Sequence, residues 1–204
     1  MLQDKIAEVE AKIKDALDKR TEPKVTGDQV TILAVTKNHP AEIVTETLAA
    51  GLTEIGENRV QEAMHKQAVL PKGGHWHLIG HLQTNKAKHA VEHFDLIESV
   101  DSLKLLGHLE KAAAELDKVQ DVLLQINEAG EVQKSGFAPA DFRAAVPELS
   151  QYPHIRVRGV MVIAQATDNV EETRPVFAAG YRDFLFLRDA LHSDAVDILS
   201  MGMT

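Results

Sequence analysis

Hydrophobic positions along the chain follow two spacings, one typical of amphipathic helices and one typical of buried strands. The first spacing opens the chain, where apolar residues recur every three or four positions and predict a helix: Leu2, Ile6, Val9, Ile13 and Leu17. The second follows at residues 31–37, a continuous apolar run flanked by threonines that predicts a buried strand. The two spacings then alternate almost to the last residue.

Seven strands are predicted, separated by helices and short connections. The strands are expected at residues 31–37, 54–57, 75–80, 96–100, 121–127, 157–163 and 197–202. The helices between them are expected near residues 40–51, 60–68, 84–92, 103–116, 139–149 and 174–191, with Ser102 as an N-cap. Alternation of this kind is typical of an α/β fold with a parallel sheet and right-handed crossovers.

Two α/β architectures fit this pattern, a doubly wound open sheet and a (β/α)8 TIM-type barrel. The first strand–helix turn, residues 37–40, lacks the Gly-x-Gly-x-x-Gly motif of dinucleotide-binding open sheets. Polar residues and glycines recur at the carboxyl ends of successive strands, where barrel enzymes place their active sites. The pattern therefore favours the barrel. Only seven of eight strands are evident, so we expect residues 1–204 to form a single barrel domain that lacks its eighth strand at the carboxyl end.

Composition narrows the class of protein. Apolar residues make up 44% of the 204 residues, there are no cysteines, and the net charge is −9. The charge argues against general binding to nucleic acid or anionic lipid. The amino terminus does not resemble a signal peptide and no apolar stretch has the length of a membrane span, so we expect a cytoplasmic protein. His77 and His81 have helical metal-ligand spacing, but they fall on a predicted strand and a glycine break, which argues against a metal site.

Candidate chemistry begins at Lys37, the last residue of the first predicted strand. An amine in apolar surroundings loses part of its preference for the charged form, and the neutral amine can form a Schiff base with an aldehyde. The alternative is a lysine that simply extends from a strand end into solvent. The tail at residues 200–204 combines hydroxyls and a glycine, which predicts a small anion-holding nest. A lysine on strand one with a phosphate site beside the last strands is the arrangement that pyridoxal 5'-phosphate requires.

Several motifs occur in an order that resembles the pyridoxal phosphate homeostasis protein family. They include Ala-Val-Thr-Lys at 34–37, Gly-Glu-Asn at 56–58, His-Leu-Ile-Gly-His-Leu-Gln at 77–83, Lys-Ser-Gly at 134–136 and Leu-Ser-Met-Gly-Met at 199–203. The match extends over nearly the whole chain. The resemblance implies a barrel similar to the amino-terminal domain of alanine racemase, with pyridoxal 5'-phosphate (PLP) as the cofactor.

The resemblance also implies individual roles. Lys37 would carry the internal aldimine. The other cofactor-binding residues would be Asn58 close to the cofactor, His81 and Met161 lining the pocket, and Ser200, Met201 and Gly202 with their backbone amides at the phosphate. Lys134 is either a second amine near the mouth or a solvated loop lysine. Family members carry an eighth strand with an arginine that faces the pyridine nitrogen, and the given sequence ends before it.

Three functions are left open by the sequence. The leading expectation is a monomeric carrier that holds PLP and delivers it to apoenzymes, because racemisation needs a second base, which racemases take from a further domain and a partner subunit. The first alternative is a low-activity amino-acid racemase or lyase. The second alternative is an unrelated phosphate-binding barrel enzyme in which Lys37 acts only as a charge.

Overall fold

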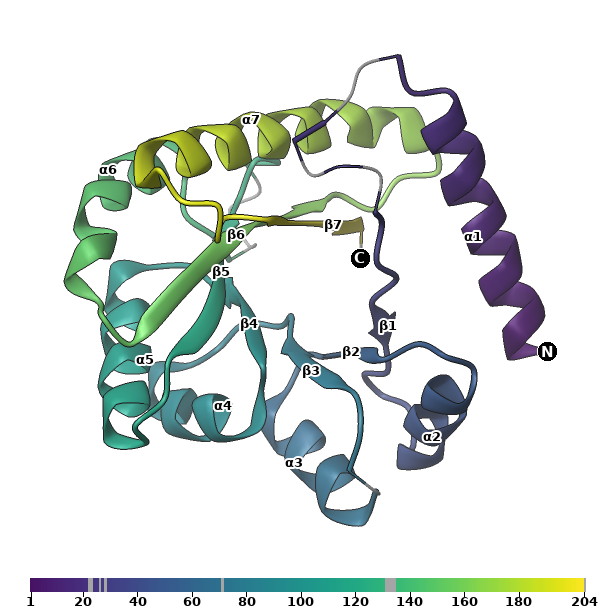
Figure 1. Cartoon of the computed structure of the whole chain (residues 1–204), viewed down its shortest axis with the longest axis horizontal. Coiled ribbons are helices and arrows are strands. Elements are labelled where there is room, and N and C mark those ends of the chain that lie inside the picture. The colour runs from purple at the N-terminus through teal and green to yellow at the C-terminus, as the bar shows by residue number, and fades with distance from the viewer. Residues whose placement is uncertain (22–23, 26, 28, 71, 131–134, 204) are drawn as a thin grey trace.

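The fold is built on one curved parallel sheet, seen in a computed structural model that describes residues 1–21, 24–25, 27, 29–70, 72–130 and 135–203 (Figure 1). The strands are β1 Ala34–Val35, β2 Glu54–Glu57, β3 His75–Leu78, β4 Leu96–Val100, β5 Gln120–Ile126, β6 Ile155–Ala164 and β7 Ile198–Met203. Each strand pairs in parallel with the next one in the sequence, in the order β1 to β7. A doubly wound sheet would reverse this order part-way. The barrel prediction is therefore confirmed, with seven strands in the described part of the chain.

Helices lie between the strands where the hydrophobic spacing predicted them. They are α1 Leu2–Asp18, α2 Ala41–Ala49, α3 Val60–Val69, α4 Ala87–His93, α5 Leu103–Glu115, α6 Pro139–Ala145 and α7 Arg174–Leu191. Short 3-10 helices precede or follow three of them, at Thr84–Lys86, Val146–Gln151 and Val170–Thr173. Helices α2 to α7 cover the outer face of the sheet (Figure 1). The hydroxyl of Ser102 accepts a hydrogen bond from the Leu105 N–H, which confirms the expected N-cap of α5.

Alternating residues of the strands face opposite sides, and both sides contain apolar clusters. The outer cluster lies between the sheet and its helices and includes Ile55, Leu78 and Val160. A smaller cluster of Leu96, Leu123 and Met161 occupies the inner face. In a barrel of this kind, ligands bind at the carboxyl ends of the strands.

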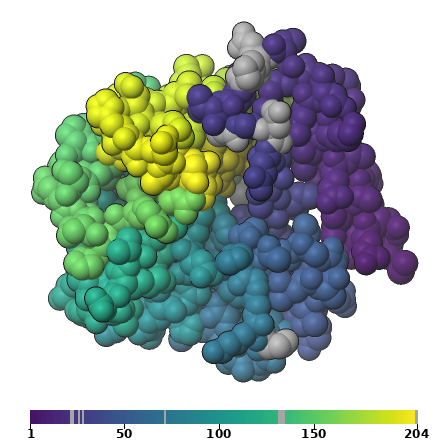
Figure 2. All heavy atoms as spheres, in the orientation of Figure 1, coloured from purple at the N-terminus to yellow at the C-terminus, as the bar shows by residue number. Residues whose placement is uncertain are grey.

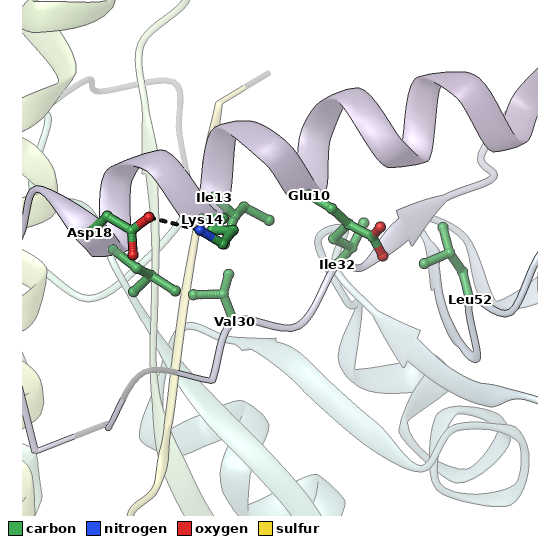
Figure 3. Close-up of a pocket in the computed structure, with 8 residues that line it drawn as sticks. Glu10, Ile13, Lys14, Asp18, Val30, Ile32 and Leu52 are labelled. Atoms are coloured by element: carbon green, nitrogen blue, oxygen red, sulfur yellow. Dashed lines mark hydrogen bonds and ion pairs between the residues drawn. The ribbon is translucent and has the colours of Figure 1, made fainter.

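Helix α1 contacts the rest of the molecule loosely. It contains no fully buried residue, and Figure 2 shows openings between α1 (purple) and the body. A hollow of about 420 Å³ separates α1 from Val30, Ile32 and Leu52, which Figure 3 shows facing the helix. Because these three residues precede β1 and β2, the hollow lies at the opposite end from Lys37. Among the described residues, no helix combines the length and the apolar character needed to cross a membrane.

Candidate functional site

Lys37 lies at the carboxyl end of β1, where the sequence placed it. Thr36, directly before it, is buried and faces α3. Lys37 itself lies in the turn after β1, and the alternation of β1 continued into this turn predicts the inner face for its side chain. The side chain of Lys37 is half-buried. Within the described chain, its ammonium forms no hydrogen bond or ion pair, in contrast to the many paired lysines elsewhere in the molecule. Lys37 therefore presents an amine that no described side chain occupies.

The backbone on both sides of Lys37 is fixed by a buried ionic cluster on the outer face. Lys66 Nζ, on α3, donates to the Thr36 carbonyl oxygen at 2.7 Å, to Glu57 Oε1 at 2.6 Å and to Glu62 Oε1 at 2.9 Å. The Thr36 hydroxyl donates to Glu57 Oε1 at 2.6 Å, and the Asn38 N–H donates to Glu62 Oε1 at 2.7 Å. Lys37 thus lies between two anchored residues.

Burial and charge make this cluster rigid. Glu57 is 0% exposed and Lys66 is 3% exposed, so neither charge has water as an alternative partner. Burial alone would raise the pKa of Glu62, but the hydrogen bond from Lys66 and the Asn38 N–H outweigh it and lower that pKa below its ordinary value. Sequence reasoning missed Lys66; the available signal was its helical spacing from Val60 and Ala63, which are buried in the same helix.

Asn58 lies at the end of β2 and is in close contact with Gly80 at the end of β3. A Cβ on Gly80 would lie 2.3 Å from the Asn58 carbonyl oxygen and 2.7 Å from its Cα. Only glycine allows this approach of the two backbones. The contact brings the ends of β2 and β3 together, and because β2 pairs with β1, Asn58 lies at the same edge of the sheet as Lys37. Its place beside the cofactor stays a prediction.

His81 lies on the rim rather than inside the mouth. Its side chain is 57% exposed, and its Nδ1 lies 3.1 Å from Asp101 Oδ2 and 3.0 Å from Ser135 Oγ. Ser135 is held in turn, because its carbonyl oxygen accepts a hydrogen bond from Gln125 Nε2 at 2.9 Å. His81 therefore connects the loops that follow β3, β4 and β5. Lys134, also a candidate, lies outside the described residues.

Met161 forms part of the floor of the interior. It is 6% exposed and packs with Leu96 and Leu123. Its neighbour across the β6–β7 pair is Ser200, so this apolar floor lies directly beside the candidate phosphate residues. The sequence placed Met161 on a strand but gave no measure of its depth.

The candidate phosphate residues adopt a strand, and the expected nest is wrong for the described residues. Ser200, Met201 and Gly202 all belong to β7 and pair in register with β6. A nest requires consecutive backbone N–H groups that converge, whereas an extended strand directs them to alternate sides. Ser200 and Gly202 share the inner face, while the side chain of Met201 is on the opposite face and 49% exposed. A Cβ on Gly202 would meet nothing within 4 Å, so the inner face is open there.

A hydrogen-bonded chain of polar side chains crosses the interior and ends at Ser200. The Ser200 hydroxyl donates to Glu98 Oε2 at 2.6 Å. His77 Nδ1 lies 2.6 Å from Glu98 Oε1, and its Nε2 lies 2.8 Å from Glu54 Oε2. Burial by itself would lower the pKa of His77, but the hydrogen bonds and charges of Glu98 and Glu54 outweigh it and raise that pKa above its ordinary value.

This chain of residues was not anticipated, although one signal was available. In β3 the apolar Trp76 and Leu78 alternate with histidines, which already places His77 on the inner face. The two histidines considered as a metal pair are separated in the fold, with His77 inside and His81 on the rim. No group of three or more His, Asp or Glu side chains suited to a metal ion occurs in the described part of the chain.

The sequence matches one family profile and several named relatives. The profile of the alanine racemase N-terminal domain family matches residues 18–204. The pyridoxal phosphate homeostasis protein of Pseudomonas aeruginosa is 40% identical over 207 residues, with 100% of this chain and 85% of the relative covered. The protein of the same name from Pasteurella multocida is 34% identical over 208 residues, with 100% and 87% covered.

Solved structures agree with these sequence matches. PipY of Synechococcus elongatus PCC7942, without PLP, is 36% identical with a TM-score of 0.77, covering 94% of this chain and 96% of PipY. PipY with PLP bound is 35% identical with a TM-score of 0.75 and the same coverage. An alanine racemase of Clostridium difficile 630 shares the fold at 15% identity and a TM-score of 0.67, and the match covers 84% of this chain and 46% of the racemase.

Proposed function

Because the chain belongs to the pyridoxal phosphate homeostasis protein family, we propose that it binds PLP at the carboxyl ends of its strands through Lys37. The observation that carries the proposal is the placement of Lys37 at the end of β1, between two anchored residues and with no partner for its amine among the described residues. PipY, which has been solved with PLP bound, is similar over 94% of the chain. The same function in this chain is the simplest account of that similarity.

The donor set at the strand ends fits the chemistry of PLP. Lys37 offers an amine, Met161 and its neighbours offer an apolar surface for a ring, and Ser200 offers a hydroxyl on the same face as the open space at Gly202. A cofactor with a flat ring and an anionic tail needs these three kinds of surface next to one another. The net charge of −9 does not oppose this, because the three features are local.

PLP supplies an aldehyde carbon with which a neutral amine condenses, with loss of one water. The residues of this chain determine whether the amine is available and correctly placed. The anchors of Thr36 and Asn38 restrict the backbone of Lys37, so its amine has a limited set of positions at the mouth. Asn58 follows β2, the strand that pairs with β1, and the Ser200 hydroxyl is the donor we assign to the phosphate.

We further propose that the protein holds and releases PLP for apoenzymes rather than catalysing a reaction. The names of the relatives support this role. Amino-acid racemisation requires acid–base groups on both faces of the cofactor. On the described rim, the His81 imidazole is one acid–base group: its Nδ1 lies beside Asp101 and Ser135, and its Nε2 has no partner among the described residues. Weak racemase or lyase activity is the alternative, and production of D-alanine from L-alanine by the PLP-loaded protein would favour it.

The binding proposal is tested by equilibrium dialysis of PLP against three forms of the protein. We expect saturable, one-to-one binding by the unaltered chain and loss of most of the affinity in Lys37→Ala. Lys111→Ala, which changes an exposed lysine on α5, is the matched control and should bind as the unaltered chain does. Equal affinity in all three forms would contradict the role of Lys37.

Delivery is tested separately. The PLP-loaded protein is mixed with the apo form of a PLP-dependent enzyme, and the recovery of that enzyme's activity is followed over time. A carrier is expected to reactivate the apoenzyme and to lose an equal amount of its own bound PLP. Retention of PLP in the presence of excess apoenzyme would contradict the carrier role while leaving binding intact.

A further inference from the structure

The single proton of the Ser200 hydroxyl already forms a hydrogen bond within the protein. A serine hydroxyl can donate one hydrogen bond and accept two. In this structure it donates to Glu98 Oε2, at the short distance of 2.6 Å that is typical of a hydroxyl on a carboxylate. A phosphate dianion offers only acceptor oxygens. The hydroxyl can therefore bind a phosphate group as a donor only after its proton has turned away from Glu98.

Glu98 is a strong and fixed competitor for that proton. Its side chain is 2% exposed, so water cannot replace a lost donor. Its other oxygen, Oε1, is held by His77 Nδ1 at 2.6 Å, and His77 is held from the far side by Glu54. The carboxylate is thus kept in position by residues of β2 and β3 while it faces Ser200 of β7 across the interior.

We propose that Glu98 competes with the phosphate group of the cofactor for the Ser200 hydroxyl and thereby sets how tightly the phosphate end is held. This inference rests on the proposed binding of PLP. When the phosphate is present, Ser200 donates to it and Glu98 keeps only the hydrogen bond from His77. When the phosphate leaves, the Ser200 hydroxyl again donates its hydrogen bond to Glu98, and this favours release. Glu98 acts through Ser200, so it is a positioning residue.

The combined charge of Glu54, His77 and Glu98 changes how strongly Glu98 competes with the phosphate for the Ser200 hydroxyl. Glu54 and Glu98 are the charged groups that face His77 in the described structure, one from β2 and one from β4. With His77 protonated, the three side chains carry a net charge of −1. Once His77 loses its proton they carry −2, which strengthens Glu98 as an acceptor and repels a dianion more strongly. Phosphate binding is therefore expected to weaken as His77 deprotonates.

The competition is tested with two ligands, PLP and pyridoxal, which share the aldehyde and ring but differ in the phosphate. The measured quantity is the ratio of their dissociation constants, compared between variants, because attachment to Lys37 and the internal hemiacetal of free pyridoxal contribute equally in each variant and cancel. Glu98→Gln keeps the shape of the side chain and removes its charge. We expect this variant to raise the preference for PLP over pyridoxal about tenfold, close to the effect of one hydrogen bond to a charged group.

A thermodynamic cycle with Ser200→Ala separates competition from simple repulsion. Ser200→Ala alone should lower the preference for PLP. In that background, Glu98→Gln should change the preference by less than about a third of the change that it causes when Ser200 is present. An unchanged or reduced preference in Glu98→Gln, with pyridoxal binding intact, would overturn the inference. A chain that binds neither ligand would instead contradict the proposed function.

The unaltered protein provides a second test that does not depend on a folded Glu98 variant. Above pH 7 a phosphate monoester is already a dianion, since its second pKa is about 6. We expect the preference for PLP over pyridoxal to fall as the pH rises above 7 and to lose this dependence in His77→Gln. A preference that is constant with pH in the unaltered protein, or that falls equally in His77→Gln, would contradict the role of the network.

Discussion

The ammonium group of Lys66 lies 2.7 Å from the main-chain carbonyl oxygen of Thr36. A charged side chain of α3 thus holds the backbone directly before Lys37 from the outer face of the sheet. The same ammonium is neutralised by Glu57, which is 0% exposed. The backbone position of Lys37, the proposed cofactor lysine, is therefore restricted by a buried ion pair on the outer face of the sheet.

Removing Lys66 is expected to destabilise the protein and to weaken cofactor binding together. Lys66→Met leaves Glu57 as an unpaired buried charge, which costs about 3–5 kcal/mol in free energy of unfolding. The loss is measured by urea unfolding. The double variant Glu57→Gln/Lys66→Met should recover part of it, because no buried charge is then unpaired.

A matched control is available on α1. Lys12→Met removes an exposed ion pair with Glu8 and should leave the free energy of unfolding unchanged within error. If Lys66→Met were no more destabilising than Lys12→Met, the buried cluster would not have the role assigned to it.

The raised pKa of His77 predicts that the free energy of unfolding depends on pH in a specific way. The Glu98 and Glu54 carboxylates outweigh burial and raise its pKa in the folded state, so the charged imidazole stabilises the fold. This contribution is complete below the unfolded pKa of about 6.5 and is lost as the pH rises through the folded pKa. Unfolding free energies between pH 6 and 9 should therefore decline less steeply in His77→Gln. Parallel curves for the two proteins would contradict this assignment.

Glu128 lies on the loop after β5, and its raised pKa predicts that replacing it stabilises the protein at high pH. Burial, followed by the hydrogen bond and charge of Asp183, raises the pKa of Glu128 to about 7. Above that pH an ionised Glu128 opposes Asp183, so stability is lost between pH 4.5 and 7. Glu128→Gln should be about 1 kcal/mol more stable than the unaltered chain at pH 8, a value reduced for its partial exposure. At pH 4.5 the two proteins should unfold alike in urea.

Gly80 and Gly107 form a matched pair of glycines for a backbone test. Gly80→Ala places a Cβ 2.3 Å from the Asn58 carbonyl oxygen and should cost about 1–3 kcal/mol, with weaker PLP binding as the ends of β2 and β3 separate. Gly107→Ala, in α5, meets nothing within 4 Å and should stabilise the protein by about 0.5–1 kcal/mol. Thermal unfolding of both variants decides the matter. Equal effects of the same sign would contradict the close approach at Asn58.

Much of the architecture could be predicted from hydrophobic spacing alone. The predicted strands at residues 54–57 and 96–100 have the observed bounds of β2 and β4, and Ser102 caps α5 as expected. Buried strands and amphipathic helices differ in period, and that difference is local in the sequence. The strand predicted at 31–37 is reduced to Ala34–Val35 because β1 pairs only with β2 at the edge of the described sheet.

The site was only partly predictable, because its connections are long-range. Lys37 and Asn58 could be placed at strand ends from their local context. The contact of Ser200 with Glu98 joins residues that are 102 positions apart, and no local pattern indicates it. The nest expected at residues 200–204 was inferred from residue types, whereas pairing with β6 fixes β7 as an extended strand. Tertiary pairing overrode local preference there.

Reductive trapping tests whether Lys37 is the residue through which the chain holds PLP. The protein is incubated with one equivalent of PLP, reduced with borohydride, digested, and the modified peptides are identified by mass spectrometry. We expect one dominant modified residue, Lys37, and loss of that label when Lys66→Met displaces its backbone. Labelling spread over exposed lysines, with Lys37 no more modified than Lys111, would contradict the account.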